Sequence, residues 1–141
     1  MKIKIASTDN FEREAKKLLK KYRSLKKELS DFQQTLIQNP RQGIKIKENT
    51  YKIRLAVKSK GTGKSGGMRI ITFVHEVVEQ PDGTIAVYLI SIYDKSNTAN
   101  ISDKFLDALI ADAMKNVQST EAIIEKPIDG EVVTDDTPKI E

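Results

Sequence analysis

The sequence predicts an α+β fold with the element order β-α-α-β-β-β-α, in which an N-terminal helical hairpin packs on a mainly antiparallel four-stranded sheet. Three observations support this class. Apolar residues recur at helical spacing between residues 9 and 38, alternate with polar residues from 51 to 57, and then form two runs rich in β-branched residues, 68–78 and 84–93. Helices followed by consecutive strands are typical of α+β proteins with an antiparallel meander.

The first strand and the two helices follow from local signals. Residues 2–6 alternate polar and apolar side chains, which predicts a short strand. Residues 7–9 can cap a first helix, and Ser24 can cap a second one that ends at Asn39-Pro40. The expected buried positions of the two helices are Phe11, Ala15, Leu18, Leu19, Tyr22, Leu25, Leu29, Phe32, Leu36 and Ile37.

The remaining elements begin with a half-buried strand over residues 51–57. A loop rich in Gly and Lys, 59–67, leads to the strand at 68–78. The turn signal at 80–83 then leads to the strand at 84–93, and because both of these strands are apolar on both faces, we expect them to be central. Ser102 can cap a last helix whose apolar side extends from Phe105 to Val117.

Charge separates the chain into a basic body and an acidic tail. Residues 1–120 contain 22 Lys and Arg against 13 Asp and Glu, whereas residues 121–141 contain 2 against 7. The helical pattern ends near residue 117, so we expect one domain over 1–117 and a largely disordered acidic tail over 118–141. A basic body favours a polyanionic partner such as nucleic acid.

Several classes of function are excluded or disfavoured. No apolar run reaches the roughly 18–20 residues of a membrane span, and the N-terminus does not have the pattern of a secretion signal. The chain has no Cys and a single His, His75, so we expect neither a metal site nor a cofactor. The absence of Cys also agrees with a reducing compartment, and we expect a cytoplasmic protein. Residues 60–67 lack the Gly spacing of a phosphate-binding loop and precede a strand instead of a helix.

The strongest candidate site is a row of cations on the predicted strands. Alternation places Lys52 and Arg54 on the face opposite Tyr51 and Ile53, with Lys58 at the edge of the same strip. Arg69 begins a central strand, where a cation needs an anionic partner or an open edge. The planar guanidinium group of Arg suits the phosphoryl group, so this strip predicts phosphate binding, although an ordinary solvated strand face has the same spacing.

These residues resemble the RelE/ParE toxin superfamily, particularly its RelE/HigB-like branch. The resemblance covers roughly residues 1–116 and depends on three segments, 51–57, 63–74 and 87–95, together with the helical hairpin. It implies a RelE-like fold and a toxin of a type II toxin–antitoxin pair. RelE also has a tyrosine near its C-terminal helix, where this chain has Ile101, and the minimal toxin has no acidic tail.

The resemblance implies a ribosome-dependent mRNA endoribonuclease, in which the 2′-hydroxyl group attacks the adjacent phosphate without a metal. Four positions match the family's functional residues: Lys52 as the candidate base, Arg54 and Arg69 as phosphate ligands, and Lys95 for the leaving group or for RNA binding. The further RNA-binding candidates near these positions are Lys45, Lys47, Lys58, Lys60, Lys64 and Tyr93.

The expected partners are a cognate antitoxin protein, mRNA on the ribosome and, through the antitoxin, operator DNA. Two alternatives remain because one fold can host different functions. One is a ParE-like inhibitor of DNA gyrase, a binding protein without chemistry of its own. The other is an inactive relative that binds only its antitoxin and DNA. Convergence of Lys52, Arg54, Arg69 and Lys95 on one face would favour the nuclease.

Overall fold

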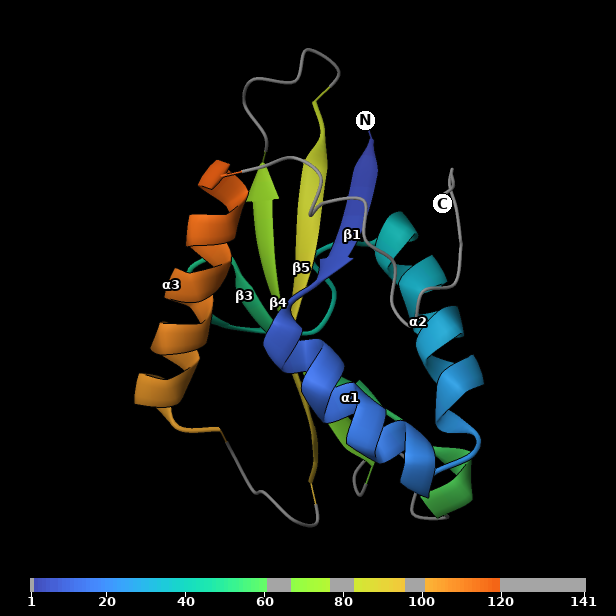
Figure 1. The fold of residues 1–141 in the computed structure, drawn as a ribbon. Helices are drawn as coiled ribbons and strands as arrows, with labels where there is room; N and C mark the ends of the chain where they lie inside the picture. Colours follow the sequence, from blue (N-terminus) through green and yellow to red (C-terminus); the bar gives the residue numbers. More distant parts are fainter. Residues whose placement is uncertain (1, 61–66, 77–82, 96–100, 120–141) are drawn as a thin grey trace.

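The computed structural model describes residues 2–60, 67–76, 83–95 and 101–119, and the protein is α+β as predicted. A mixed five-stranded sheet has helices on both faces (Figure 1). In chain order, the elements are β1 (Ile3–Ser7), α1 (Asp9–Lys21), α2 (Leu25–Gln38), β2 (Ile44–Lys47), β3 (Thr50–Leu55), the short 3₁₀ turn η1 (Lys58–Lys60), β4 (Met68–Glu76), β5 (Ile85–Asp94) and α3 (Asp103–Ser119).

The sheet differs from the predicted one in two respects. Its strand order is β1-β5-β4-β3-β2, and β2 was not predicted because four residues alternating Ile and Lys after Gly43 give too short a signal. Three pairings are antiparallel, but β1 runs parallel to β5, with Ile3 opposite Ile85. The predicted number of four strands is therefore wrong, and the prediction did not include the one parallel pairing.

The predicted caps are largely confirmed. The Thr8 hydroxyl group accepts a hydrogen bond from the Phe11 amide at 3.2 Å, and the Ser102 hydroxyl group accepts one from the Phe105 amide at 3.2 Å. Ser24 occupies the N-cap position of α2, but its side chain bonds to Glu28 and Ser59 instead of capping the helix. Ile37 is exposed, which corrects its predicted burial.

Two apolar clusters hold the helices to the sheet. The first joins α1 and α2 to one face, through side chains such as Phe11, Leu25 and Leu36 against Ile70 and Val87. The second joins α3 to the other face, through side chains such as Leu106 and Ala113 against Tyr88. The two faces are called here the α1–α2 face and the α3 face. As predicted, the central strands β4 and β5 are buried nearly throughout.

Helix α1 also takes the place of a strand beside β5. Strand β1 ends opposite Leu89, so the second half of β5 has no strand on that side. There, Asn10 Nδ2 donates to the Ile90 carbonyl oxygen at 3.0 Å, and Glu14 Oε1 accepts from the Ile92 amide at 3.1 Å. These bonds satisfy backbone groups that would otherwise lie unpaired at a sheet edge.

The predicted tail lies almost entirely outside the described residues. Helix α3 extends to Ser119, two residues beyond the predicted boundary, and residues 120–141 are not described. The domain boundary at residue 117 therefore stays a prediction.

Candidate nucleic-acid interface

The strand register brings three predicted residues into one row across the sheet. Arg54 of β3 lies directly opposite Arg69 of β4, and Arg69 lies directly opposite Tyr93 of β5. Side chains of directly opposed residues point to the same face of an antiparallel sheet. Tyr93 belongs to the apolar cluster beneath α3, so the whole row lies on the α3 face.

Lys52 lies on the same face, two residues before Arg54. It is opposite Ile71, which also packs in the cluster beneath α3. The alternation that predicted a common face for Lys52 and Arg54 is therefore confirmed. Arg54 is exposed and Lys52 is half-buried, so both side chains reach solvent.

The Arg69 side chain is buried, at 5% relative exposure, and so does not lie at an open edge, which was one of the two environments expected for it. Its guanidinium Nη1 donates to the carbonyl oxygen of Met68 at 3.2 Å. Strand β4 is covered on both faces at this point, in keeping with the central position predicted for it. A charge held in this way is fixed in place and only weakly screened by water.

Tyr93 brings a second buried polar group to the row. Its side chain is 8% exposed, and within the described part of the chain no group completes a hydrogen bond of normal geometry to the hydroxyl group, although the backbone of Ile101 is close enough to influence it. Burial raises the pKa of Tyr93, while the Arg69 charge opposes that rise. The hydroxyl group therefore stays protonated near neutral pH and can donate a hydrogen bond.

Lys95 lies at the end of the sheet that carries the row. Its backbone amide donates to the carbonyl oxygen of Gly67 at 3.1 Å, one step beyond the pairing of Met68 with Asp94. Lys95 follows Tyr93 by two residues and is half-buried. The four residues expected to be catalytic are thus gathered at one end of three adjacent strands.

The additional lysines are dispersed. Lys45 and Lys58 are exposed, whereas Lys47 of β2 pairs with Asp107 of α3. Lys45 is opposite Tyr51, on the α1–α2 face, and so lies away from the row. Lys64 lies outside the described residues.

Lys60 has an internal role that the sequence did not indicate. Its Nζ lies 3.0 and 3.1 Å from the two carboxylate oxygens of Asp94, and both side chains are almost fully buried. The Tyr22 hydroxyl group donates to the same carboxylate at 3.0 Å. The hydrogen bond to Asp94 raises the pKa of Lys60. We therefore remove Lys60 from the proposed RNA-binding set.

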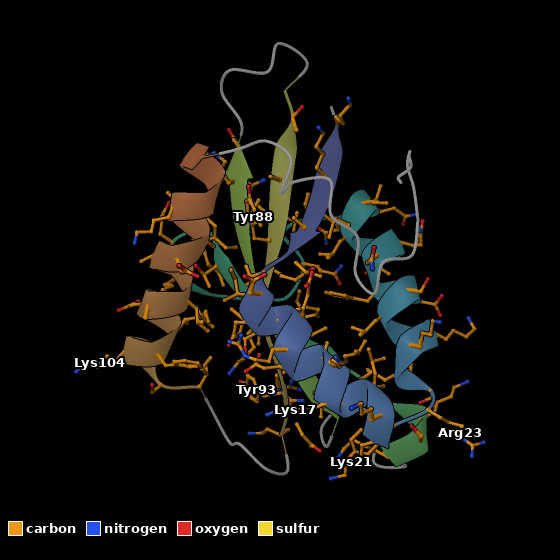
Figure 2. All side chains as sticks on the ribbon, viewed as in Figure 1. Lys17, Lys21, Arg23, Tyr88, Tyr93 and Lys104 are labelled. Atoms are coloured by element: carbon orange, nitrogen blue, oxygen red, sulfur yellow. The ribbon has the colours of Figure 1, made fainter. Side chains whose placement is uncertain are left out.

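Sequence reasoning missed a group of cations on α1. Lys16, Lys17, Lys20 and Lys21 are all exposed, and no Asp or Glu occurs between residues 15 and 27. Their spacing places them on one side of the helix, opposite Phe11 and Ala15. The helical periodicity used to predict the buried stripe could have identified this stripe as well. Figure 2 shows Lys17 and Lys21 at the same end of the molecule as Tyr93.

Comparison with known proteins does not assign this chain to a family. No family model matches it, and no curated protein matches it significantly. Among the described residues, no group of three or more His, Cys, Asp or Glu side chains could hold a metal ion. None of the helices within this part of the chain is both long and apolar enough to span a bilayer.

Proposed function

We propose that the protein is a RelE-type toxin of a type II toxin–antitoxin pair, which cleaves mRNA on the ribosome. The observation that carries the proposal is the row Arg54–Arg69–Tyr93, with Lys52 on the same face. Two guanidinium groups and a phenol facing one way match the needs of a phosphodiester substrate, which is anionic and gains charge in the transition state.

The chemistry assigns one role to each residue. Lys52 removes the proton from the 2′-hydroxyl group, whose oxygen attacks the adjacent phosphorus while the bond to the 5′-oxygen of the next nucleotide breaks. The products are a 2′,3′-cyclic phosphate and a 5′-hydroxyl group, whose proton comes from Lys95. Arg54 and Arg69 stabilise the charge that develops on the phosphoryl oxygens, and Tyr93 donates a hydrogen bond to the bound strand.

The proposal extends to location and partners. The protein acts in the cytoplasm, where its substrate is mRNA on the ribosome. A cognate antitoxin protein neutralises it and can bring it to operator DNA. The basic body of the chain fits both polyanions, since Lys and Arg neutralise phosphate charge irrespective of sequence.

Expression without antitoxin tests the proposal. The wild-type protein should arrest translation, and primer extension on translated mRNA should show cleavage that depends on ribosomes. Arg69→Ala should lower the cleavage rate on the order of 100- to 1000-fold, as expected for loss of a preorganised charge donor. Lys58→Ala, an exposed lysine beyond the end of β3, is the comparison variant and should lose far less activity than Arg69→Ala.

The burial of Arg69 favours a second candidate, a binding protein without chemistry, because a covered guanidinium group does not face a substrate directly. If mRNA stays whole while DNA supercoiling falls, the protein is a ParE-like gyrase inhibitor. If growth continues and neither effect occurs, it is an inactive relative that binds its antitoxin and DNA. Either result replaces the nuclease.

A further inference from the structure

The position of α1 beside β5 connects the row on the sheet to the lysines of the helix. Successive residues of α1 contact successive residues of β5. The Asn10 side chain bonds to the Ile90 carbonyl oxygen, Glu14 bonds to the Ile92 amide, and Tyr22 bonds to Asp94. Lys17 lies between Glu14 and Tyr22 on the helix, so it lies beside β5 at the level of Tyr93.

The orientation of α1 determines the direction in which these lysines point. Asn10, Glu14, Lys17 and Lys21 follow one another at intervals of four, three and four residues and form a single row along the helix. The first two members of this row contact the edge of β5, so the last two continue along the same edge. Lys20 is about 180° from Phe11, which is fully buried against the α1–α2 face, so Lys20 points away from that core.

The cationic row of the sheet therefore continues onto the helix. From β3 to β5, it crosses two strand spacings, about 10 Å, and the neighbouring helix adds about another 10 Å. The outer side of α1 bears exposed lysines without acidic residues among them, and none of the large exposed apolar side chains of the described residues belongs to α1. A protein partner would need an apolar centre for its interface, whereas a phosphate backbone needs only charge.

We propose that a bound RNA strand contacts Arg54 at the exposed end of this row, passes the edge of β5 that α1 covers and continues along the outer side of α1, where Lys17, Lys20 and Lys21 bind its phosphates. This path rests on the proposed function for the sheet part of the site. It adds a substrate-binding surface on a helix, where the lysines hold the strand without touching the bond that breaks.

Binding of a fluorescein-labelled 12-nucleotide single-stranded RNA to the full chain tests the path. Anisotropy would be followed between 50 and 200 mM KCl for wild type and for Lys17→Gln/Lys20→Gln. Each lost phosphate contact lowers the slope of log K against log salt by about 0.7, so the double variant should lose about 1.4. The ratio of the wild-type binding constant to that of the double variant should accordingly fall roughly sevenfold between 50 and 200 mM KCl.

The matched control is Lys2→Gln/Lys115→Gln, which removes the same charge elsewhere. The backbone carbonyl group of Lys2 binds Ile85, at the opposite end of β5 from Tyr93, and Lys115 lies in the second half of α3. This control should keep the wild-type slope. If both double variants lost the same amount of slope, the effect would come from net charge alone, and the proposed path would be overturned.

Photocrosslinking gives a second readout of position. A single 4-thiouridine moved along the same RNA should crosslink to peptides of α1 when it is near one end and to peptides of β3 when it is near the other. Crosslinks that never reach α1 would overturn the path while leaving the site on the sheet intact. Wild type that binds no free RNA would also overturn it, whereas ribosome-dependent cleavage would still test the proposed function separately.

Discussion

Arg54 and Arg69 lie directly opposite each other on β3 and β4, with both side chains on the α3 face. Like charges in directly opposed positions destabilise an antiparallel pair, by roughly 0.2–1 kcal/mol. Under the proposed function, an anionic substrate bound near this pair would offset that repulsion.

Replacing the exposed member of this pair separates stability from activity. Arg54→Ala should leave the free energy of unfolding unchanged or raise it by up to about 1 kcal/mol, because the repulsion disappears. The same variant should cleave mRNA more slowly. Urea denaturation and primer extension measure the two effects. Lys45→Ala, whose neighbour across the strands is Tyr51, should not gain stability in this way. A clear loss of stability in Arg54→Ala would show that Arg54 has a structural role.

The buried ion pair between Lys60 and Asp94 should matter for folding and not for RNA. Lys60→Met leaves the carboxylate without its cation, and breaking a buried pair from one side typically costs about 3–5 kcal/mol. The exposed neighbour provides the control, since Lys58→Met should change stability by less than about 0.5 kcal/mol. Thermal and urea denaturation measure both. A folded Lys60→Met protein with weakened RNA binding would return Lys60 to the interface.

The same ion pair predicts a dependence of stability on high pH. The folded-state pKa of Lys60 is raised above the ordinary value of 10.5, so its contribution is fully present below 10.5. That contribution is lost as the pH rises through the raised folded-state value. Unfolding curves measured from pH 9 upward should show this decline in wild type. The Lys60→Met protein should lack that part of the decline.

The environment of Glu14 predicts that stability also falls with rising pH in the acidic range. Burial raises the pKa of Glu14 above 4.5, although hydrogen bonds from Ser91, Ile92 and Asn10 oppose the shift. The folded state then binds the proton more tightly than the unfolded chain does, so the Glu14 contribution to stability falls as pH rises from 4.5 through the raised value. Glu14→Gln should remove this slope from the pH–stability curve. An unchanged slope would contradict the pKa shift.

How much of this molecule could be predicted depended on how locally each feature is encoded. The stripe of apolar residues in α1 and the alternation of Lys52 and Arg54 are local patterns, and both identified the correct face. The strand β2 was missed because four residues carry little periodicity. The parallel pairing of β1 with β5 joins residues far apart in sequence, so no local pattern could reveal it.

Side-chain roles were harder to predict than faces. Lys60 and Lys58 have similar sequence surroundings, yet one is buried against Asp94 and the other is exposed. The difference depends on where the end of β5 meets the 3₁₀ turn, which is a tertiary contact. The burial of Arg69 likewise depends on the layers above and below β4. The lysines of α1 became relevant to the site only through the docking of that helix beside β5.

The acidic C-terminal segment should influence RNA binding through its charge. Deleting residues 120–141 removes seven acidic and two basic residues and raises the net charge from +4 to +9. The truncated protein should bind the labelled RNA more tightly, most clearly at low salt, since charges are screened over about 10 Å at 0.1 M. Equal affinities of the two proteins at low salt would mean that the segment does not act on RNA binding.

The pairing of β1 with β5 also constrains when the protein can complete its fold during its own synthesis. Ile3 finds its partner only when Ile85 is available, and Tyr93 completes the row on the sheet later still. Contacts this distant in sequence form slowly, because a long loop must close before they stabilise the chain. A nascent chain therefore emerges with its first strand unpaired and its cations dispersed. Under the proposed function, the interval before the fold is complete, set by chain length, would precede any toxicity.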